Sequence, residues 1–299
     1  MKAISHLLPL LLLVVPIIWG LYGYFKTRGE VKNNLPINAR STSVVVINSA
    51  VLYALSFNII FFIQELFLAL GKRWLGLKAI LYHNNHNWEG SHPMESLAQG
   101  YGAAAIFVVG LICLAIVYKT KHSSHWMHLF WIWLAFQGLA QSIPQFITAR
   151  SAPDTDTGQA FTYLGISEAM GIAITVAGIL GMLWLGMLTS KLLVRLSPAA
   201  ALIQTASGRF GYLFRIALLA SILGIALIVP FRIMPWDRAL APVFVTLLSV
   251  PMVFAHAWKV KFANATNNDV NKKILIVPIV LLAIVLLIFQ LVLAKGVVM

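Results

Sequence analysis

The stretch Val44–Leu70 reads VVVINSAVLYALSFNIIFFIQELFLAL, a continuous apolar run with few polar interruptions. A membrane-spanning helix needs about 20 mainly apolar residues, whereas the strands of a membrane β-barrel alternate apolar and polar positions. This run has the length of a span and lacks the alternation of a strand. It therefore predicts a transmembrane α-helix.

Similar apolar runs recur on both sides of this stretch, and together they predict an all-α, polytopic transmembrane helical bundle of about eight spans. The predicted spans are Ile4–Tyr24, Val44–Leu70, Gly102–Tyr118, Leu129–Thr148, Ala169–Leu188, Gly211–Phe231, Ala239–Trp258 and Ile274–Ala294. No small-residue cleavage site follows the first run, so we expect a retained span rather than a signal peptide. No connection is long enough for a soluble domain, so residues 1–299 should form one integral membrane domain.

The composition supports a membrane protein. Hydrophobic residues make up 60% of the chain and charged residues 10%, against roughly 25% charged residues in an average soluble domain. These values exclude a soluble globular protein, a disordered chain and a nucleic-acid binder. The net charge of +13 comes from cations that flank the apolar runs, where they contact anionic lipid and orient the spans. We predict the lipid bilayer as a partner, no nucleic acid, and a multi-pass location in the inner membrane.

Polar side chains lie inside two of the predicted spans. The second span carries Asn58 and Glu65, which are seven residues apart and so share one helix face. The fourth span carries Gln137, Gln141 and Gln145 at intervals of four, which form one stripe. Polar groups are costly in hydrocarbon, so we expect both stripes to face the bundle interior. There they join helices by hydrogen bonds, or they line the path of a membrane transporter.

Histidines gather in two connections, one on each side of the third predicted span. The first set is His83, His86 and His92, and the second set is His122, His125 and His128. Neutral imidazoles at such spacings can share a metal ion. The span between the sets is ~25 Å long at 1.5 Å per residue, so the two sets cannot build one centre. The first set is a candidate metal site, and a polar interfacial loop is the alternative.

Two motifs flank the third and fourth predicted spans. The chain reads QELFLALGKRWLGLK over Gln64–Lys78, and PDTDTG over Pro153–Gly158. The first resembles the active-site helix of the site-2 protease family of intramembrane zinc metalloproteases, in which His-Glu-x-x-His precedes small and apolar residues, a basic residue and Leu-Gly. The second resembles the Asp-Gly region of that family, whose Asp is the third zinc ligand. The resemblance covers about Asn58–Gly158 and implies a site-2-protease-like core at about residues 43–190.

The zinc-binding positions of the family depart from its pattern in this chain. With Glu65 aligned at the general-base position, the two zinc-binding histidines fall on Gln64 and Leu68. An amide is a poor zinc ligand and a leucine is none, whereas proteolysis needs a zinc-bound water and a Glu that takes its proton. The third ligand corresponds to Asp154 or Asp156, followed by Gly158. The resemblance therefore implies a core without peptidase activity, which binds other transmembrane proteins or acts as an accessory subunit.

A rearranged metal site is the alternative function. If the connection after the motif helix folds back into the bilayer, His83 and His86 would meet Glu65 and Asp156, with His92 nearby. Such a metal-dependent membrane enzyme would take zinc as its cofactor. The orientation in the membrane stays open. Cations are slightly more frequent in the odd-numbered loops, which favours a cytoplasmic place for these loops, whereas the family resemblance favours the second and fourth loops there.

Overall fold

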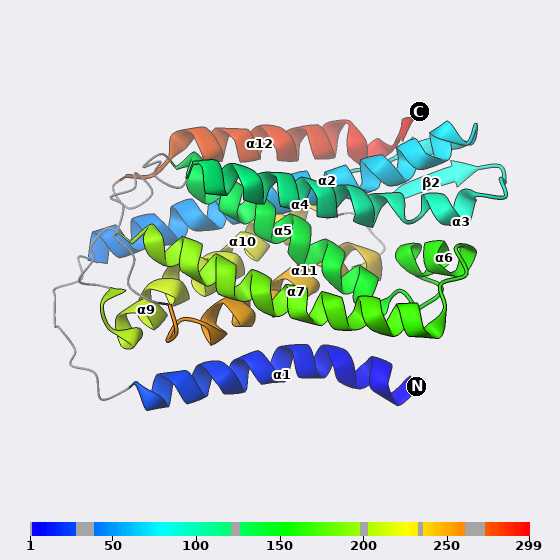
Figure 1. Cartoon of the computed structure of the whole chain (residues 1–299). Helices are drawn as coiled ribbons and strands as arrows, with labels where there is room; N and C mark the ends of the chain where they lie inside the picture. The colour runs from blue at the N-terminus through cyan, green and yellow to red at the C-terminus, as the bar shows by residue number, and fades with distance from the viewer. Residues whose placement is uncertain (1, 28–38, 121–125, 198–202, 233–235, 261–272) are drawn as a thin grey trace.

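The computed structural model describes residues 2–27, 39–120, 126–197, 203–232, 236–260 and 273–299, with side chains except those of residues 2–13, 39–42, 237 and 238. Most of these residues are helical, which confirms the all-α class. The long helices run side by side along one direction, with α12 on one side of the bundle and α1 on the opposite side (Figure 1).

Helices cover all eight predicted stretches. The long helices are α1 (Lys2–Lys26), α2 (Ala39–Trp74), α4 (Tyr101–Lys119), α5 (Met127–Thr148), α7 (Glu168–Arg195), α11 (Trp236–Ala255) and α12 (Ile276–Leu291). The sixth stretch falls in one helical run made of α9 (Ala206–Leu213), the π-helical η1 (Phe214–Leu219), α10 (Ala220–Ile228) and the 3-10 turn η2 (Val229–Phe231). The short elements are β1 (Lys78–Leu81), β2 (His86–Glu89), α3 (Glu95–Ala98), α6 (Asp156–Tyr163), η4 (Leu293–Lys295) and β3 (Val297–Val298).

Five helical segments in the described ranges are long and apolar enough to cross a membrane, which makes the chain a multi-pass membrane protein. They are Ser43–Trp74, Glu95–Lys119, Glu168–Arg195, Ala206–Phe231 and Ile276–Lys295. A shorter apolar helix covers Ala239–Ala255. The total of eight spans stays a prediction.

Helix α5 lies at the centre of the bundle, in contact with α2, α4 and α7. Its approach to α4 is close because two glycines meet there: a Cβ on Gly138 would lie 2.7 Å from the Ile106 carbonyl oxygen and 2.8 Å from the Gly110 Cα. Small residues of this kind allow membrane helices to pack backbone to backbone. A hydrogen bond also joins α5 to α2, since Trp133 Nε1 donates to Ser49 Oγ at 3.0 Å.

A small antiparallel sheet with the strand order β2-β1-β3 lies at one end of the bundle. The sequence predicted only a polar connection after the second span, so this sheet is a new feature. Gly76, at a φ of 78°, turns the chain from the end of α2 into β1, a left-handed conformation that glycine adopts without strain. β1 then pairs with β2 in a hairpin and with β3 from the C-terminal end of the chain.

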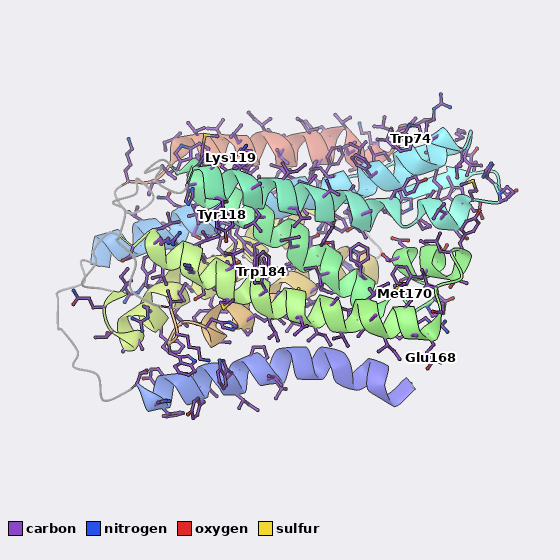
Figure 2. The ribbon with its side chains drawn as sticks, in the orientation of Figure 1. Trp74, Tyr118, Lys119, Glu168, Met170 and Trp184 are labelled. Atoms are coloured by element: carbon purple, nitrogen blue, oxygen red, sulfur yellow. The ribbon has the colours of Figure 1, made fainter. Side chains whose placement is uncertain are left out.

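The outer face of the bundle is apolar, and its ends carry aromatic and charged side chains. Trp74 lies at the sheet end, whereas Tyr118 and Lys119 lie at the opposite end (Figure 2). On α7, Met170 and Trp184 are exposed. Amphipathic aromatic residues are typical of the two membrane–water interfaces. Both chain termini lie at the sheet end (Figure 1).

Candidate functional site

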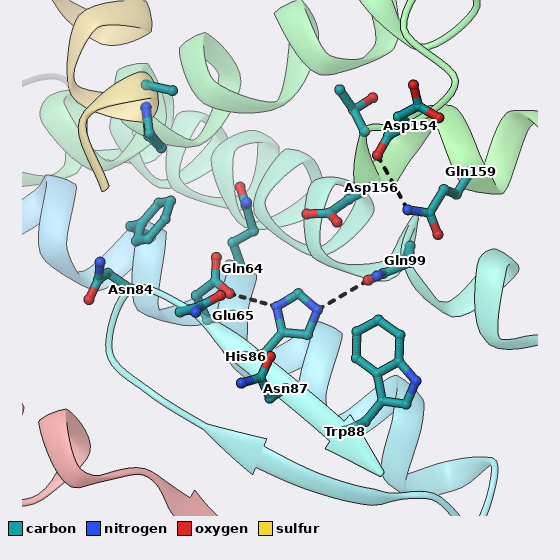
Figure 3. A pocket seen from close by; sticks show the side chains of 15 residues that line it. Gln64, Glu65, Asn84, His86, Asn87, Trp88, Gln99, Asp154, Asp156 and Gln159 are labelled. Carbon is teal, nitrogen blue, oxygen red and sulfur yellow. Dashed lines mark hydrogen bonds and ion pairs between the residues drawn. The ribbon is translucent and has the colours of Figure 1, made fainter. Parts of the chain in front are cut away.

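A pocket of about 530 Å³ lies at the sheet end of the bundle, between α2, the β1–β2 hairpin, α6 and α11 (Figure 3). It is lined by Phe61, Gln64, Glu65, Asn84, Asn85, His86, Asn87, Trp88, Gln99, Asp154, Thr155, Asp156, Gln159, Ala241 and Pro242. Most of these side chains are polar, although three candidate spans border the same end of the bundle. This pocket collects much of the chemistry that the sequence places in and beside the spans.

A buried ion pair forms the floor of the pocket. The Glu65 carboxylate accepts a hydrogen bond from His86 Nδ1 at 2.9 Å. His86 Nε2 donates to the side-chain oxygen Oε1 of Gln99 at 3.1 Å. Burial lowers the pKa of His86, but Glu65, Asp156 and Gln99 together raise it by more than burial lowers it. The pKa of His86 therefore lies above its usual value. Both ring nitrogens face acceptor oxygens, an arrangement that favours the imidazolium form of His86.

The strand alternation explains how the hairpin delivers His86 to Glu65. Successive side chains of a strand point to opposite faces of the sheet. Ala79 and Leu81 of β1 are buried, and their partners across the ladder are Trp88 and His86. One face of the hairpin therefore packs toward α2 and carries His86 with it. The other face is open, where Lys78 and Glu89 make an exposed ion pair that contributes little stability.

Lys72 ties the helix, the hairpin and α3 together. Its side chain is fully buried, its ammonium donates to the Glu95 carbonyl oxygen, and Nζ lies 4.2 Å from the centre of the Trp88 ring. A cation over an aromatic face in a desolvated site contributes about 1–2 kcal/mol. Lys72 therefore supports the wall of the pocket rather than its floor.

Two residues that the sequence resemblance aligns with zinc ligands, Gln64 and Leu68, make other contacts in the structure. Gln64 Oε1 accepts a hydrogen bond from Gln145 Nε2 at 3.0 Å, and Leu68 is fully buried. Gly102 of α4 packs on both, since a Cβ there would lie 2.7 Å from Leu68 Cγ and 2.9 Å from Gln64 Cγ. Neither side chain fits a zinc ion.

The glutamine stripe of α5 meets α2 at Gln64, next to Glu65. Besides its bond to Gln64, Gln145 accepts from Thr157 Oγ1 at 3.2 Å, so α5 is tied to both α2 and α6. Gln141 Nε2 donates to Gln137 Oε1 at 3.2 Å within the α5 stripe. Asn58 instead donates to the Ala54 carbonyl of its own helix and is not brought to the pocket.

The Asp-Thr-Asp-Thr-Gly segment forms the start of α6 at the pocket rim. Thr155 caps the helix by accepting a hydrogen bond from the Gly158 amide at 3.2 Å. Gly158 is needed because a Cβ there would lie 2.0 Å from the Ala152 carbonyl oxygen. Asp154 and Asp156 both line the pocket, and the charge of Asp156 acts on His86.

The three histidines of the first set are not brought together. His83 Nε2 donates to the Phe231 carbonyl oxygen at 2.8 Å, and the His83 ring stacks on Phe289. His92 accepts from the Met94 amide at the start of α3. In the described part of the chain, no three His, Cys, Asp or Glu side chains form a group that could hold a metal ion. Of the second set, His122 and His125 lie outside the described residues, and His128 contacts Thr120.

Two residues that line the pocket, Trp88 and Gln99, were not anticipated from the sequence. Ala79-Ile80-Leu81 followed by Asn84-Asn85 is a short strand-and-turn signal that could have indicated the hairpin. No family model, no curated protein and no solved structure matches this chain. The function is therefore argued from the geometry.

Proposed function

We propose that this chain is an inner-membrane protein with a site-2-protease-like core that lacks peptidase activity and binds another membrane protein at the pocket. The observation that carries the proposal is the ion pair between Glu65 and His86, at the position where the family has its general base. A carboxylate held by an imidazolium is a poor acceptor for the proton of a water molecule. Gln64 and Leu68, at the positions that the resemblance aligns with zinc ligands, also cannot hold the metal that would acidify such a water.

The edge of the sheet suggests how a partner would bind. Within the described ranges, β2 has one neighbouring strand, β1, and its other edge lies beside the pocket. An extended segment can bind a free strand edge through main-chain hydrogen bonds, and pockets for its side chains then provide specificity. We expect an extended segment of a membrane protein to lie along Asn85–Trp88.

Metal analysis tests the absence of peptidase chemistry. We expect wild-type protein purified in a mild detergent to hold far less than one zinc per chain, and Glu65→Gln and His86→Ala to leave that content unchanged. About one zinc per chain, lost in both variants, would instead favour a metal-dependent enzyme that uses Glu65, His86 and Asp156. Cleavage of a co-expressed membrane protein that depends on Glu65 would also refute the proposal.

Photo-crosslinking tests the binding of a partner. A benzoylphenylalanine residue at Asn87, which lines the pocket, should give a discrete crosslink to a membrane protein in intact cells. The same residue at Trp184, on the outer face of α7 (Figure 2), is the matched control and should give lipid adducts or none. Equal crosslinking from both positions would show that the pocket has no selective partner.

The number of spans and the orientation belong to the same proposal. We propose eight spans, with both termini on one side of the inner membrane. Reporter fusions after Lys119, Arg195 and Met299 test this arrangement, because the first two lie at one end of the bundle and the third at the other. The two internal fusions should agree with each other and differ from the C-terminal fusion.

A membrane transporter is the second candidate, and the amide chain favours it. Hydrogen bonds link Gln64 with Gln145, and Gln141 with Gln137, which leads from the pocket into the bundle. Among the residues that the structure describes, Gln137 Nε2 and Gln141 Oε1 have no hydrogen-bond partner. Uptake of small polar solutes by proteoliposomes that falls in Gln141→Leu would support a transporter, and uptake insensitive to that substitution would count against it.

A further inference from the structure

Arg232 is a buried cation without a counterpart. Its side chain is 6% exposed, and Nε, Nη1 and Nη2 all lack a hydrogen-bond partner among the residues that the structure describes. Arginine carries five N–H donors in a planar fork. Buried charges in proteins are almost always paired, because an uncompensated ion costs several kcal/mol. A guanidinium with no acceptor therefore indicates that a ligand belongs beside it.

The position of this guanidinium is well defined. Its Cζ lies 4.3 Å from the centre of the Phe61 ring and 4.9 Å from that of Phe57, both on α2. The turn that carries it is fixed as well, because the Phe231 carbonyl oxygen accepts hydrogen bonds from His83 Nε2 and Gln290 Nε2, each at 2.8 Å. The donors are thus held in place by aromatic stacking and by hydrogen bonds of the neighbouring backbone.

No carboxylate in the described residues neutralises Arg232. Glu65 is close enough to raise the pKa of Arg232, yet burial lowers that pKa by more, to about 9, so the group remains a cation at neutral pH. The Glu65 carboxylate is already bonded to the His86 imidazolium at 2.9 Å. This carboxylate therefore already has a hydrogen-bonded partner other than Arg232.

We propose that Arg232 is the anchor of an oxyanion site, which binds the carboxylate or phosphate group of a ligand at the inner wall of the pocket. Phe61 lines the pocket and also stacks on Arg232, so the guanidinium lies behind this ring, which must turn aside for a ligand in the pocket to reach it. A planar guanidinium binds such groups through two parallel N–H···O bonds. The ligand is a small oxyanion or an anionic lipid headgroup.

The first experiment measures thermal unfolding of the full chain in a neutral detergent. Sodium phosphate and sodium acetate are titrated against sodium chloride at equal ionic strength. We expect the midpoint of wild type to rise saturably by at least about 3 °C with one or both oxyanions. Arg232→Gln should abolish this rise, and Arg232→Lys should reduce it, since lysine keeps the charge but not the fork. Arg150→Gln, which removes an exposed arginine, should respond like wild type.

A second experiment identifies the source of the oxyanion. Native mass spectrometry of protein exposed to phosphatidylglycerol or phosphatidylcholine should show a retained phosphatidylglycerol that Arg232→Gln loses, if the ligand is a lipid. A response to phosphate or acetate without a retained lipid assigns a soluble ligand. The proposal is overturned if wild type responds to neither salt nor lipid, or if Arg232→Gln responds as wild type does. If Arg232→Gln does not fold, the wild-type titration and Arg232→Lys decide.

Discussion

Glu65 on α2 and His86 on β2 lie 21 residues apart in the chain and form an ion pair of 2.9 Å, with side chains 6% and 8% exposed. This one contact holds the hairpin on the helix and sets the charge of the pocket floor. It also occupies the carboxylate that the sequence assigns to the general-base position. The stability and the pH response of the protein should both depend on it.

Removing one partner of this pair should destabilise the protein strongly. His86→Ala removes the hydrogen-bonded counter-ion of the buried Glu65 carboxylate, which costs about 3–5 kcal/mol. Unfolding in mixed detergent micelles measures this loss. Glu65→Gln combined with His86→Gln should cost clearly less than the sum of the two single substitutions. Lys78→Ala breaks an exposed pair and should cost less than about 1 kcal/mol. If the double substitution costs as much as the two single substitutions added together, the pairing of Glu65 with His86 is contradicted.

The pair should also make stability fall on the alkaline side. The pKa of His86 is raised in the folded state above about 6.5 in the unfolded chain. Its contribution is therefore fully present below about pH 6.5 and is lost as the pH rises through the folded pKa. The free energy of unfolding of wild type minus that of His86→Gln, measured against pH, should show this decline. An increase of this difference with pH would refute the ion pair.

His83 should make the stability of the protein fall on the acidic side. Burial lowers its pKa to about 4, helped by the charge of Arg232 and opposed by the hydrogen bond to the Phe231 carbonyl. Between about pH 6.5 and pH 4 the unfolded chain takes up a proton that the folded chain does not, so stability falls on acidification. His83→Gln keeps a donor for Phe231 and should flatten this slope. His92→Gln is the control, and an equal flattening there would contradict the assignment.

The helical fold could be predicted from sequence because its signal is long. Apolar runs such as Val44–Leu70 carry enough residues to define a span, and α2 covers that run. The hairpin could not be predicted in this way, since β1 and β2 have four residues each. That is too short for a clear alternation of apolar and polar residues. The strand β3 comes from the far end of the chain, so its pairing with β1 depends on how α12 packs.

The site was predictable residue by residue but not as an arrangement. Glu65 stands out as an ionisable group inside a predicted span, Asp156 through the family resemblance, and His86 as a member of a histidine set. Their convergence on one pocket depends on the hairpin, which brings His86 back to α2 and leaves His83 and His92 elsewhere. Arg232 follows an apolar run, where cations commonly flank a span. Only its burial distinguishes it from the other flanking cations, and burial cannot be read from the sequence.

A substitution at the pocket rim tests whether the backbone there is as tightly packed as the geometry indicates. Gly158→Ala would place a Cβ 2.0 Å from the Ala152 carbonyl oxygen, so the turn before α6 must shift, at a cost of about 1–3 kcal/mol. Gly211→Ala is the matched control, because nothing lies within 4 Å of its Cβ position and alanine favours a helix by up to about 1 kcal/mol. Unfolding in mixed micelles should therefore show a loss for Gly158→Ala and no loss for Gly211→Ala. Equal effects would mean that the start of α6, and Asp156 with it, is free to move away from the pocket.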